Sequence, residues 1–339
     1  MRQGRIIAIV LMSMLMGQYR PIPSVVTKVG TASENWLKLE TGTRAIGMGG
    51  AYVAFGTGVS SVPYNPAGVG YVNGMELYVS RTNYLAGITH NVISFGTRLS
   101  GSNFLGFHLF YLDSGPMDVT TEAYADGTGE KFSMRSFSFR TTYARRMTDR
   151  LKLGITLNVI HNTIYTVRTR GVAVDIGSNF DTGLYGFILG MSVTNFGPEV
   201  QYHGEGLTEV VPDTIDPDGQ LLKVTESFPL PLSFRIGIAN DLVGKESVFV
   251  KSDVHRLSVA LDGINPIDYV MYGSMGLEYS YREFAFIRWG THLNHDTMGM
   301  SAGAGVTVDL GGWALTVDYA FVGNATIEPT HQFGLNFQF

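Results

Sequence analysis

The sequence ends in the stretch HQFGLNFQF, which runs from His331 to Phe339. Side chains alternate between the two faces of a β-strand. One face of this strand would therefore carry Phe333, Leu335, Phe337 and Phe339, and the other Gln332, Gly334, Asn336 and Gln338. In a soluble protein, a terminal strand with so apolar a face would be an exposed sheet edge that promotes aggregation. In a closed transmembrane barrel lipid covers the apolar face and the first strand pairs with the edge, so the stretch predicts such a barrel.

The same alternation recurs along the chain after Gly74. In residues 151–159, for example, aliphatic side chains at the odd-numbered positions oppose Lys152, Gly154, Thr156 and Asn158. We find about 14 such segments between Gly74 and Phe339. This pattern predicts an all-β fold, a transmembrane antiparallel β-barrel of about 14 strands.

Short and long connections alternate between these segments. The short ones lie at 101–102, 148–149, 181–183, 244–245, 282–283 and 311–312, and the longer ones at 114–130, 161–168, 197–228, 255–269, 294–297 and 323–329. Outer-membrane barrels have short periplasmic turns and longer outer loops. This order of short and long connections places Phe339 on the periplasmic side, together with the short turns. It favours a barrel in the bacterial outer membrane over a soluble sandwich or propeller, which would share the alternation alone.

Composition excludes several classes of protein. The chain has 339 residues, of which 45% are hydrophobic, and its mean hydropathy is only +0.10. A helical membrane bundle would need repeated apolar runs of about 20 residues, and the sequence lacks them. The net charge of −5 gives no indication of a nucleic-acid partner. Cysteine is absent, which rules out disulfides, thiol nucleophiles and Cys-ligated metal sites.

The chain begins with two segments that do not alternate. Arg2, Arg5 and the apolar run 6–16 are typical of a signal peptide, which we place at residues 1–24 without a clear cleavage site. Residues 25–73 are rich in small residues and turn formers, notably Gly47, Gly49, Gly50, Asn65, Pro66 and Ala67. Small residues allow close backbone packing. We therefore expect residues 25–73 to be a compact hatch inside the lumen of a barrel that spans residues 74–339.

Charged side chains occupy the polar face of the alternating segments. A charge that faced lipid would cost about 2–4 kcal/mol near the membrane midplane, so these side chains are expected to face the lumen. They are Arg98, Arg140, Arg235, Lys251, Asp253, Glu278, Arg288 and Asp318. Two interpretations stay open: a solvated, mutually paired lining in contact with the hatch, or a path for a substrate.

Signatures of catalysis and of cofactor binding are missing from the sequence. The glycine run at 47–50 lacks the Gly-Lys-Ser/Thr ending of a phosphate-binding loop. No Gly-x-Ser-x-Gly motif is present. His292 and His295 would point to opposite faces of a strand, so joint metal ligation is not expected. We predict no catalytic, cofactor or metal site.

Several motifs resemble those of the PorV/PorQ family within the FadL-like outer-membrane barrels. They are GMGGAYVAF (47–55), NPAGVG (65–70), GVAVDIG (171–177), SVTNFGP (192–198) and LPLSFRIGIA (230–239). The resemblance covers nearly the whole chain after the signal segment. The ending with Phe333, Phe337 and Phe339 also resembles the assembly signal of outer-membrane proteins.

The resemblance implies two possible functions for a barrel surrounded by outer-membrane lipid. PorV and PorQ proteins serve type IX secretion, which predicts a barrel that docks exported proteins or secretion-system proteins, chiefly through the long loop 197–228. FadL-like members instead transport hydrophobic small molecules past a hatch and sideways through a strand kink. The secretion role is our main expectation and transport is the alternative.

Overall fold

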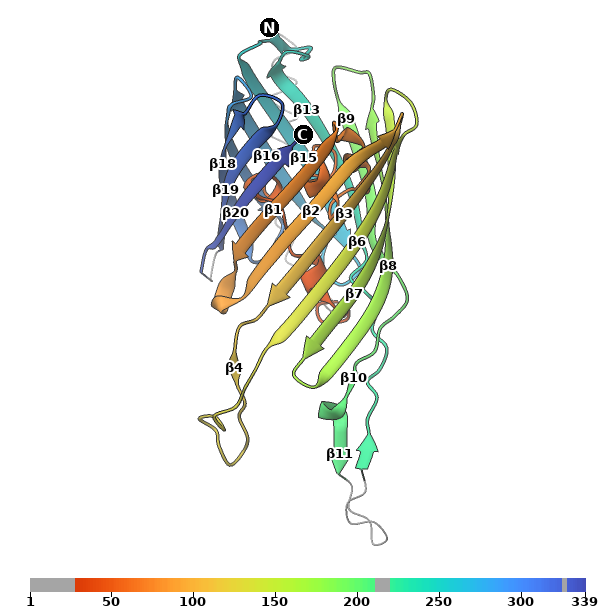
Figure 1. The fold of residues 1–339 in the computed structure, drawn as a ribbon, viewed down its shortest axis with the longest axis vertical. Coiled ribbons are helices and arrows are strands. Elements are labelled where there is room, and N and C mark those ends of the chain that lie inside the picture. The colour runs from red at the N-terminus through yellow and green to blue at the C-terminus, as the bar shows by residue number, and fades with distance from the viewer. Residues whose placement is uncertain (1–27, 211–219, 325–327) are drawn as a thin grey trace, which may run out of the picture.

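The chain folds as a closed barrel (Figure 1). The computed structural model describes residues 28–210, 220–324 and 328–339, so the expected signal peptide lies outside the described residues. Within that part, one sheet has 16 strands, and its two-residue members β10 (His203–Gly204) and β14 (Val250–Lys251) lie at the margins, which leaves 14 in the wall. The expected antiparallel barrel of about 14 strands is confirmed.

The wall strands follow one another around the ring in chain order. They are β1 (Met75–Asn83), β2 (Thr89–Ser100), β3 (Asn103–Asp113), β6 (Met134–Arg146), β7 (Leu151–Ile164), β8 (Val167–Asp181), β9 (Ile188–Phe196), β13 (Ser233–Gly244), β15 (His255–Pro266), β16 (Tyr272–Tyr281), β17 (Ala285–Leu293), β18 (Met298–Asp309), β19 (Ala314–Asn324) and β20 (Thr330–Gln338). Every neighbouring pair is antiparallel.

The terminal stretch closes the ring. β20 pairs with β1 in a register that places Leu335 opposite Val79 and Phe337 opposite Leu77. The last residue continues this pairing, because the Phe339 N–H donates to the Met75 carbonyl at 2.9 Å. Phe333 is 58% exposed on the outer face, while Gln332 is buried in the lumen. The apolar face of this strand therefore points to lipid, and its edge is paired.

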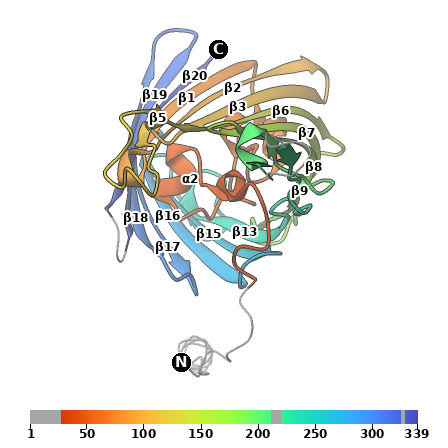
Figure 2. The same ribbon diagram turned by 90° about the horizontal axis from the view of Figure 1, so that it is seen from below.

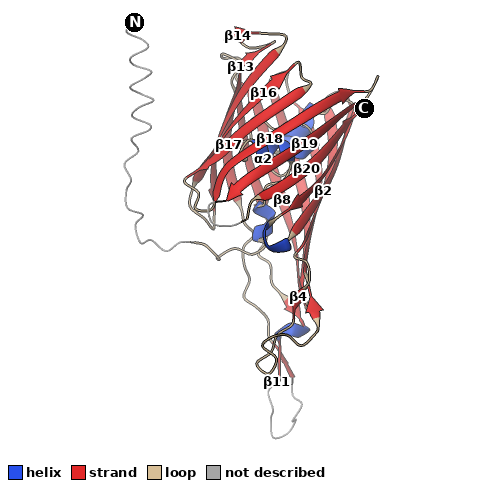
Figure 3. Cartoon of the chain, turned by 90° about the vertical axis from the view of Figure 1, so that its left-hand side faces the viewer, coloured by secondary structure: helices blue, strands red, loops and turns tan. Residues whose placement is uncertain are grey.

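The two ends of the barrel differ in the length of their connections. At the end that holds Phe339, here called the short-turn end, connections include the turn at 101–102 and the turn at 282–284. At the opposite long-loop end, residues 114–133 contain β4 (Met117–Asp118) and β5 (Lys131–Phe132). Residues 197–232 there contain η5 (Glu205–Leu207), β11 (Thr208–Val210) and β12 (Gln220–Leu222). These two connections extend far beyond the wall (Figures 1 and 3).

Two of the expected long connections are wrong. Residues 161–168 form a tight hairpin, because β7 and β8 stay paired as far as Ile164 and Val167. The sequence predicts a loop here because the outward side chains at this end of the two strands are polar, which interrupts the alternation of apolar and polar residues. Residues 255–269 are mostly strand β15, in which the outward Gly263 and Asn265 hide the alternation.

The outer surface of the wall is an apolar belt. Outward side chains along β7, for example, include Ile155, Leu157 and Val159, which are 43–55% exposed. Their neighbours on the strand, Thr156 and Asn158, are fully buried in the lumen. Burial of such a belt in lipid is favourable, whereas exposure of it to water is not. Among the described residues, no helix is long and apolar enough to cross a membrane. An apolar belt around a closed antiparallel ring is typical of a barrel that spans a membrane with its strands.

Residues 28–73 are here called the N-terminal segment; apart from the exposed residues 28–31 at its start, it lies within the ring of strands (Figure 2). This segment contains η1 (Asn35–Lys38), α2 (Thr43–Gly47), η2 (Val59–Ser61) and η3 (Pro66–Tyr71). A further short helix, η4 (Leu85–Gly87), lies in the β1–β2 connection. At the long-loop end the Ser33 N–H donates to the Pro229 carbonyl at 2.9 Å. At the short-turn end Arg146 donates to the Gly70 carbonyl at 2.7 Å. The segment therefore traverses the lumen from one end to the other.

Candidate functional site

Glycines on the wall let the N-terminal segment approach the strand backbone. An added Cβ at Gly290 of β17 would collide with the backbone of Met48 and Gly49. An added Cβ at Gly154 of β7, on another side of the ring, would collide with Pro66 and Ala67. Only residues without a side chain permit such contact. The N-terminal segment therefore contacts the backbone of β17 on one side of the ring and the backbone of β7 on another.

The expected hatch residues divide between these two contact regions. Gly47 packs against Gly303 of β18, and Gly49 against β17. An added Cβ at Gly50 would instead meet the carboxylate of Glu40. Asn65 donates its side-chain N–H groups to the carbonyls of Val53 at 2.7 Å and Ser178 at 2.9 Å. Pro66 and Ala67 lie against β7. Whether the segment moves as a hatch stays a prediction.

A network of charges occupies one side of the lumen. Glu278 of β16 is fully buried and accepts hydrogen bonds from Arg44, Arg256 and Arg288 at 2.7–2.8 Å. Arg288 also donates to Asp318 of β19 at 2.5 Å. Burial disfavours a charged guanidinium, but Glu278 raises the pKa of Arg44 above its ordinary value. Arg44 therefore stays charged and ties the N-terminal segment to the wall.

The expected lumen charges do not all meet. Glu278, Arg288 and Asp318 share the network, while Arg140 lies 3.6 Å from Asp175 on the other side of the ring. Arg235 lies over the ring of Tyr64 at 5.4 Å. Arg98 lies on the lumen face at the short-turn end of β2, where it is exposed, lies over the ring of the buried Phe104 at 5.9 Å and donates to the Gly101 carbonyl. Two placements are wrong, because Lys251 and Asp253 lie past the end of β13 and are exposed in the connection that follows it.

Further anchors come from residues that the sequence did not single out. The Asp262 carboxylate of β15 accepts the backbone N–H groups of Tyr52 at 2.7 Å and Val53 at 2.8 Å. Asp262 and Arg256 are not among the predicted lumen charges, because the sequence predicts a connection at 255–269. The alternation with Ser258 and Ala260, both buried, was the available signal. Arg44 lies in the non-alternating segment, where no such signal exists.

The histidines at the long-loop end of β17 are side by side rather than on opposite faces. The His292 and His295 rings are 5.7 Å apart, because Asn294 turns the chain with a φ of 61°. His292 Nε2 lies 2.9 Å from the Glu40 carboxylate. In the described part of the chain, no group of three or more His, Cys, Asp or Glu side chains is placed to hold a metal ion.

The other side of the lumen contains an apolar cluster. Trp36 of the N-terminal segment stacks on Phe110 of β3 with ring centroids 5.5 Å apart. One continuous cluster extends from there to both ends of β3 and across to the long connection after β9. Its members include Trp36, Leu37, Val59, Val62, Val69, Val72, Val92, Phe104, Phe110, Leu112, Ile160, Val200 and Leu230. The inward face therefore carries the charge network on β15–β19, whereas on β2–β8 this apolar cluster lies among polar side chains such as Ser138 and Asn158.

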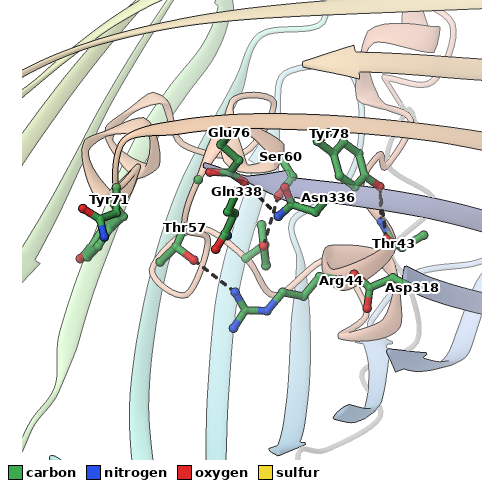
Figure 4. A pocket seen from close by; sticks show the side chains of 13 residues that line it. Thr43, Arg44, Thr57, Ser60, Tyr71, Glu76, Tyr78, Asp318, Asn336 and Gln338 are labelled. Atoms are coloured by element: carbon green, nitrogen blue, oxygen red, sulfur yellow. Dashed lines mark hydrogen bonds between the residues drawn. The ribbon is translucent and has the colours of Figure 1, made fainter. Parts of the chain in front are cut away.

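A small polar cavity remains beside the N-terminal segment at its short-turn half (Figure 4). Its volume is about 140 Å³. Glu76 on its wall accepts a hydrogen bond from Asn336 at 3.1 Å, and Arg44 donates to Thr57 at 3.1 Å. A cavity with these walls suits water or a small polar solute and would not stabilise an apolar ligand.

The wall is interrupted between β8 and β13. β9 has only 9 residues beside the 15 of β8, and its pairing with β8 ends at Val174 and Phe196. The backbone turns at Asn195, whose φ is 61° and whose N–H donates to Asp175 at 2.6 Å, and β9 ends at the next residue. The first residues of β8 therefore lack a long neighbouring strand on this side. We call this gap the lateral notch.

Apolar side chains seal the lateral notch. Val200 and Leu230 fill it and are 4% and 2% exposed. Val200 exchanges two backbone hydrogen bonds with Phe228, at 2.8 and 2.9 Å. An outer depression of about 620 Å³ lies against this seal, between Val159, Val172 and Pro198. Side-chain packing, rather than a continuous ladder of strand hydrogen bonds, closes the wall here.

Comparison with known proteins identifies the fold. No family model and no curated protein matches this chain. The CymD monoaromatic hydrocarbon channel is similar in structure, with a TM-score of 0.58 at 14% identity over 88% of this chain and 97% of that one. The toluene transporter TodX of Pseudomonas putida has a TM-score of 0.57 at 12% identity over 88% and 97%. A FadL homologue of Pseudomonas aeruginosa has 0.53 at 10% over 88% and 98%. This chain shares the fold of these FadL-type outer-membrane barrels.

Proposed function

We propose that this protein passes small hydrophobic molecules from the long-loop side of the outer membrane into the bilayer through the lateral notch. Proteins named as hydrocarbon channels and as a toluene transporter share its fold over most of both chains. Because those neighbours are channels and transporters, we also retain the expectation that the protein is not an enzyme. Monoaromatic hydrocarbons are the first ligands to test.

The lateral notch is the observation that carries this proposal. A hydrophobic molecule that left through the short-turn end would have to pass the charge network around Glu278 and the polar cavity. A molecule that left sideways would pass Val200 and Leu230 in the seal and then the outward Val172, below Arg170 at the edge of the depression. Transfer between apolar surroundings avoids the cost of contact with water.

The apolar cluster would supply the path to the notch. Trp36 and Phe110 lie toward the long-loop end, and the same cluster contains Ile160, Val200 and Leu230. In the closed arrangement the N-terminal segment covers this path, so the segment acts as a hatch that must shift before a ligand can pass. Its charged anchors on β15–β17 would hold one side while the apolar side separates.

A disulfide across the seal tests the proposal. The native chain has no cysteine, so a pair introduced by Gly171→Cys and Val200→Cys would be unique. A Cβ at Gly171 lies 2.9 Å from a methyl group of Val200, which is close enough for a disulfide. Oxidation should reduce the uptake of radiolabelled toluene by cells to the level of a deletion strain, and reduction should restore it.

Each single-cysteine variant is the control and should transport normally in both redox states. Uptake that is unchanged in the cross-linked protein, with the disulfide verified by mass, would contradict the lateral route. The secretion role implied by the PorV/PorQ resemblance stays a prediction without support from the comparisons. Part of the loop expected to dock exported proteins, residues 211–219, lies outside the described residues.

A further inference from the structure

β7 and β8 are longer than the membrane requires. They have 14 and 15 residues, whereas about 9–11 residues of a tilted strand cross a bilayer. Their exposed apolar side chains cover residues 153–159 of β7 and 172–180 of β8. The remaining residues, toward the long-loop end, therefore extend out of the hydrocarbon layer to the depth of the lipid headgroups.

Basic side chains gather on this extension. Arg168 and Arg170 of β8 face outward, since Thr169 between them is buried in the lumen. The strand register places His161 opposite Arg170, and Thr163 between Arg168 and Arg135 of β6. His203 of β10 pairs with Arg168 on the other side. We call Arg135, His161, Arg168, Arg170 and His203 the arginine rim.

Two of these arginines have no carboxylate partner. Arg135 lies 3.7 Å from Asp113, but within residues 28–210, 220–324 and 328–339 neither Arg168 nor Arg170 forms an ion pair. A depression of about 570 Å³ lies beside them, lined also by Gln201, His203 and Glu199. Glu199 is the one carboxylate among its lining residues. A group with two or more negative charges would satisfy both guanidinium groups.

The arginine rim continues directly into apolar surface. Arg170 also lines the neighbouring depression of about 620 Å³, whose walls include Val159 and Val172. These valines face outward and are 43% and 49% exposed. On the opposite part of the ring, the outward side chains at the long-loop ends of β17 and β18 are Leu293 and Met300. The arginine rim, with an apolar groove directly below it, thus distinguishes this face from that of β17 and β18.

We propose that the arginine rim binds the phosphate groups of a phosphorylated lipid in the leaflet on the long-loop side. Guanidinium groups bind phosphate through paired, charge-assisted hydrogen bonds. An acyl chain of the lipid lies along Val159 and Val172. This binding can be measured without transport, because it needs neither an open notch nor movement of the N-terminal segment.

Native mass spectrometry of the full chain in a neutral detergent tests this binding, with diphosphoryl lipid A as the probe. The variant Arg168→Gln/Arg170→Gln should bind roughly tenfold or more weakly, because each substitution removes a charge-assisted pair. Arg145→Gln/Arg150→Gln is the matched control, since these arginines lie at the short-turn end of the β6–β7 hairpin, and should bind normally. Glu199→Gln should strengthen binding by removing a negative charge from the depression.

Three results would overturn the proposal. The first is an equal loss of binding in the rim variant and the control variant. The second is equal binding of lipid A from which both phosphates have been removed. The third is displacement of the lipid by inorganic phosphate at the same concentration, which would indicate a plain anion site. Heat-modifiable migration in gels shows that each variant is folded, and toluene uptake by the rim variant distinguishes a failure here from a failure of the transport proposal.

Discussion

Glu278 organises the charged side of the lumen at the scale of single residues. Its carboxylate has no exposed surface and accepts hydrogen bonds from three arginines, one of which, Arg44, belongs to the N-terminal segment. In the low-dielectric interior, such an acceptor compensates for the burial of several cations. One residue thus links the wall strands β15, β16 and β17 with the element that fills the barrel.

Glu278→Gln should destabilise the protein strongly. The change preserves the side-chain shape but leaves buried guanidinium groups without their counter-charge, a loss of about 3–5 kcal/mol for buried pairs. The midpoint of urea unfolding in detergent should fall accordingly. Glu283→Gln is the control, because Glu283 also pairs with Arg256 at 2.7 Å but is 60% exposed and should contribute at most about 1 kcal/mol. Equal effects of the two variants would contradict the importance of burial.

Gly154→Ala should loosen the N-terminal segment. The added methyl group would overlap with the backbone of Pro66 and Ala67, and overpacking of this kind costs about 1–3 kcal/mol. Hydrogen exchange at residues 65–70 should become faster. Gly263→Ala is the control, since that glycine faces outward with its nearest neighbouring atom 3.7 Å away. Unchanged exchange in the Gly154 variant would show that the segment does not depend on this contact.

At the scale of elements, β9 and β20 show that the length of a strand and the regularity of its alternation determine how the wall is held together locally. β20 is regular, pairs fully with β1 and β19, and directs its aromatic residues to lipid, where Trp313 stacks on Phe337 and Phe339. The role of Phe333, Phe337 and Phe339 as an assembly signal stays a prediction. β9 is short and has a left-handed residue just before its end, so the wall there depends on side-chain packing.

Leu335→Arg should impair the barrel at its closing strand. Leu335 is 40% exposed on the lipid face in the middle of β20, where a charge costs about 2–4 kcal/mol. The yield of folded, heat-modifiable protein in outer-membrane fractions should fall. Gln338→Arg on the same strand is the control, because Gln338 lies on the lumen side and lines the polar cavity. If both variants assemble equally well, the outer face of β20 does not contact lipid.

The whole molecule is a barrel closed in two ways. The strands form an unbroken ring around its circumference, apart from the lateral notch, and the N-terminal segment fills its interior. The segment is held by charged groups on the side of β15–β17, and by apolar packing and hydrogen bonds such as that from Asn65 to Ser178 on the side of β6–β8. Whether one side can detach while the other stays anchored, as a hatch requires, stays a prediction.

Deletion of residues 28–73 should convert the barrel into an open pore. A ring of this size encloses water once the element that fills it is removed. Single-channel recordings in planar bilayers should show low conductance for the full chain and a large, stable conductance for the deletion variant. Deletion of residues 117–132, in the loop that extends away from the barrel, should leave conductance low. Conductance of the full chain equal to that of the deletion would mean that the segment does not close the lumen.

The sequence by itself determined the kind of fold, the strand number and the outward face of each regular strand. Period-two alternation is a local property, so Phe333–Phe339 and residues 151–159 reveal their faces without knowledge of their neighbours. The alternation does not reveal β15, because Gly263 and Asn265 interrupt it there. It also predicts lumen positions for Lys251 and Asp253, which lie past the end of β13.

Only the tertiary structure decided which residues meet. Arg44 and Glu278, or Arg170 and His161, come together through the register of strands and the path of the N-terminal segment, and these depend on contacts between residues far apart in the chain. The lateral notch likewise follows from the unequal lengths of β8, β9 and β13. Alternation specifies on which face a side chain lies, whereas ring closure and register specify its neighbours, because pairing is a long-range interaction that no local pattern contains.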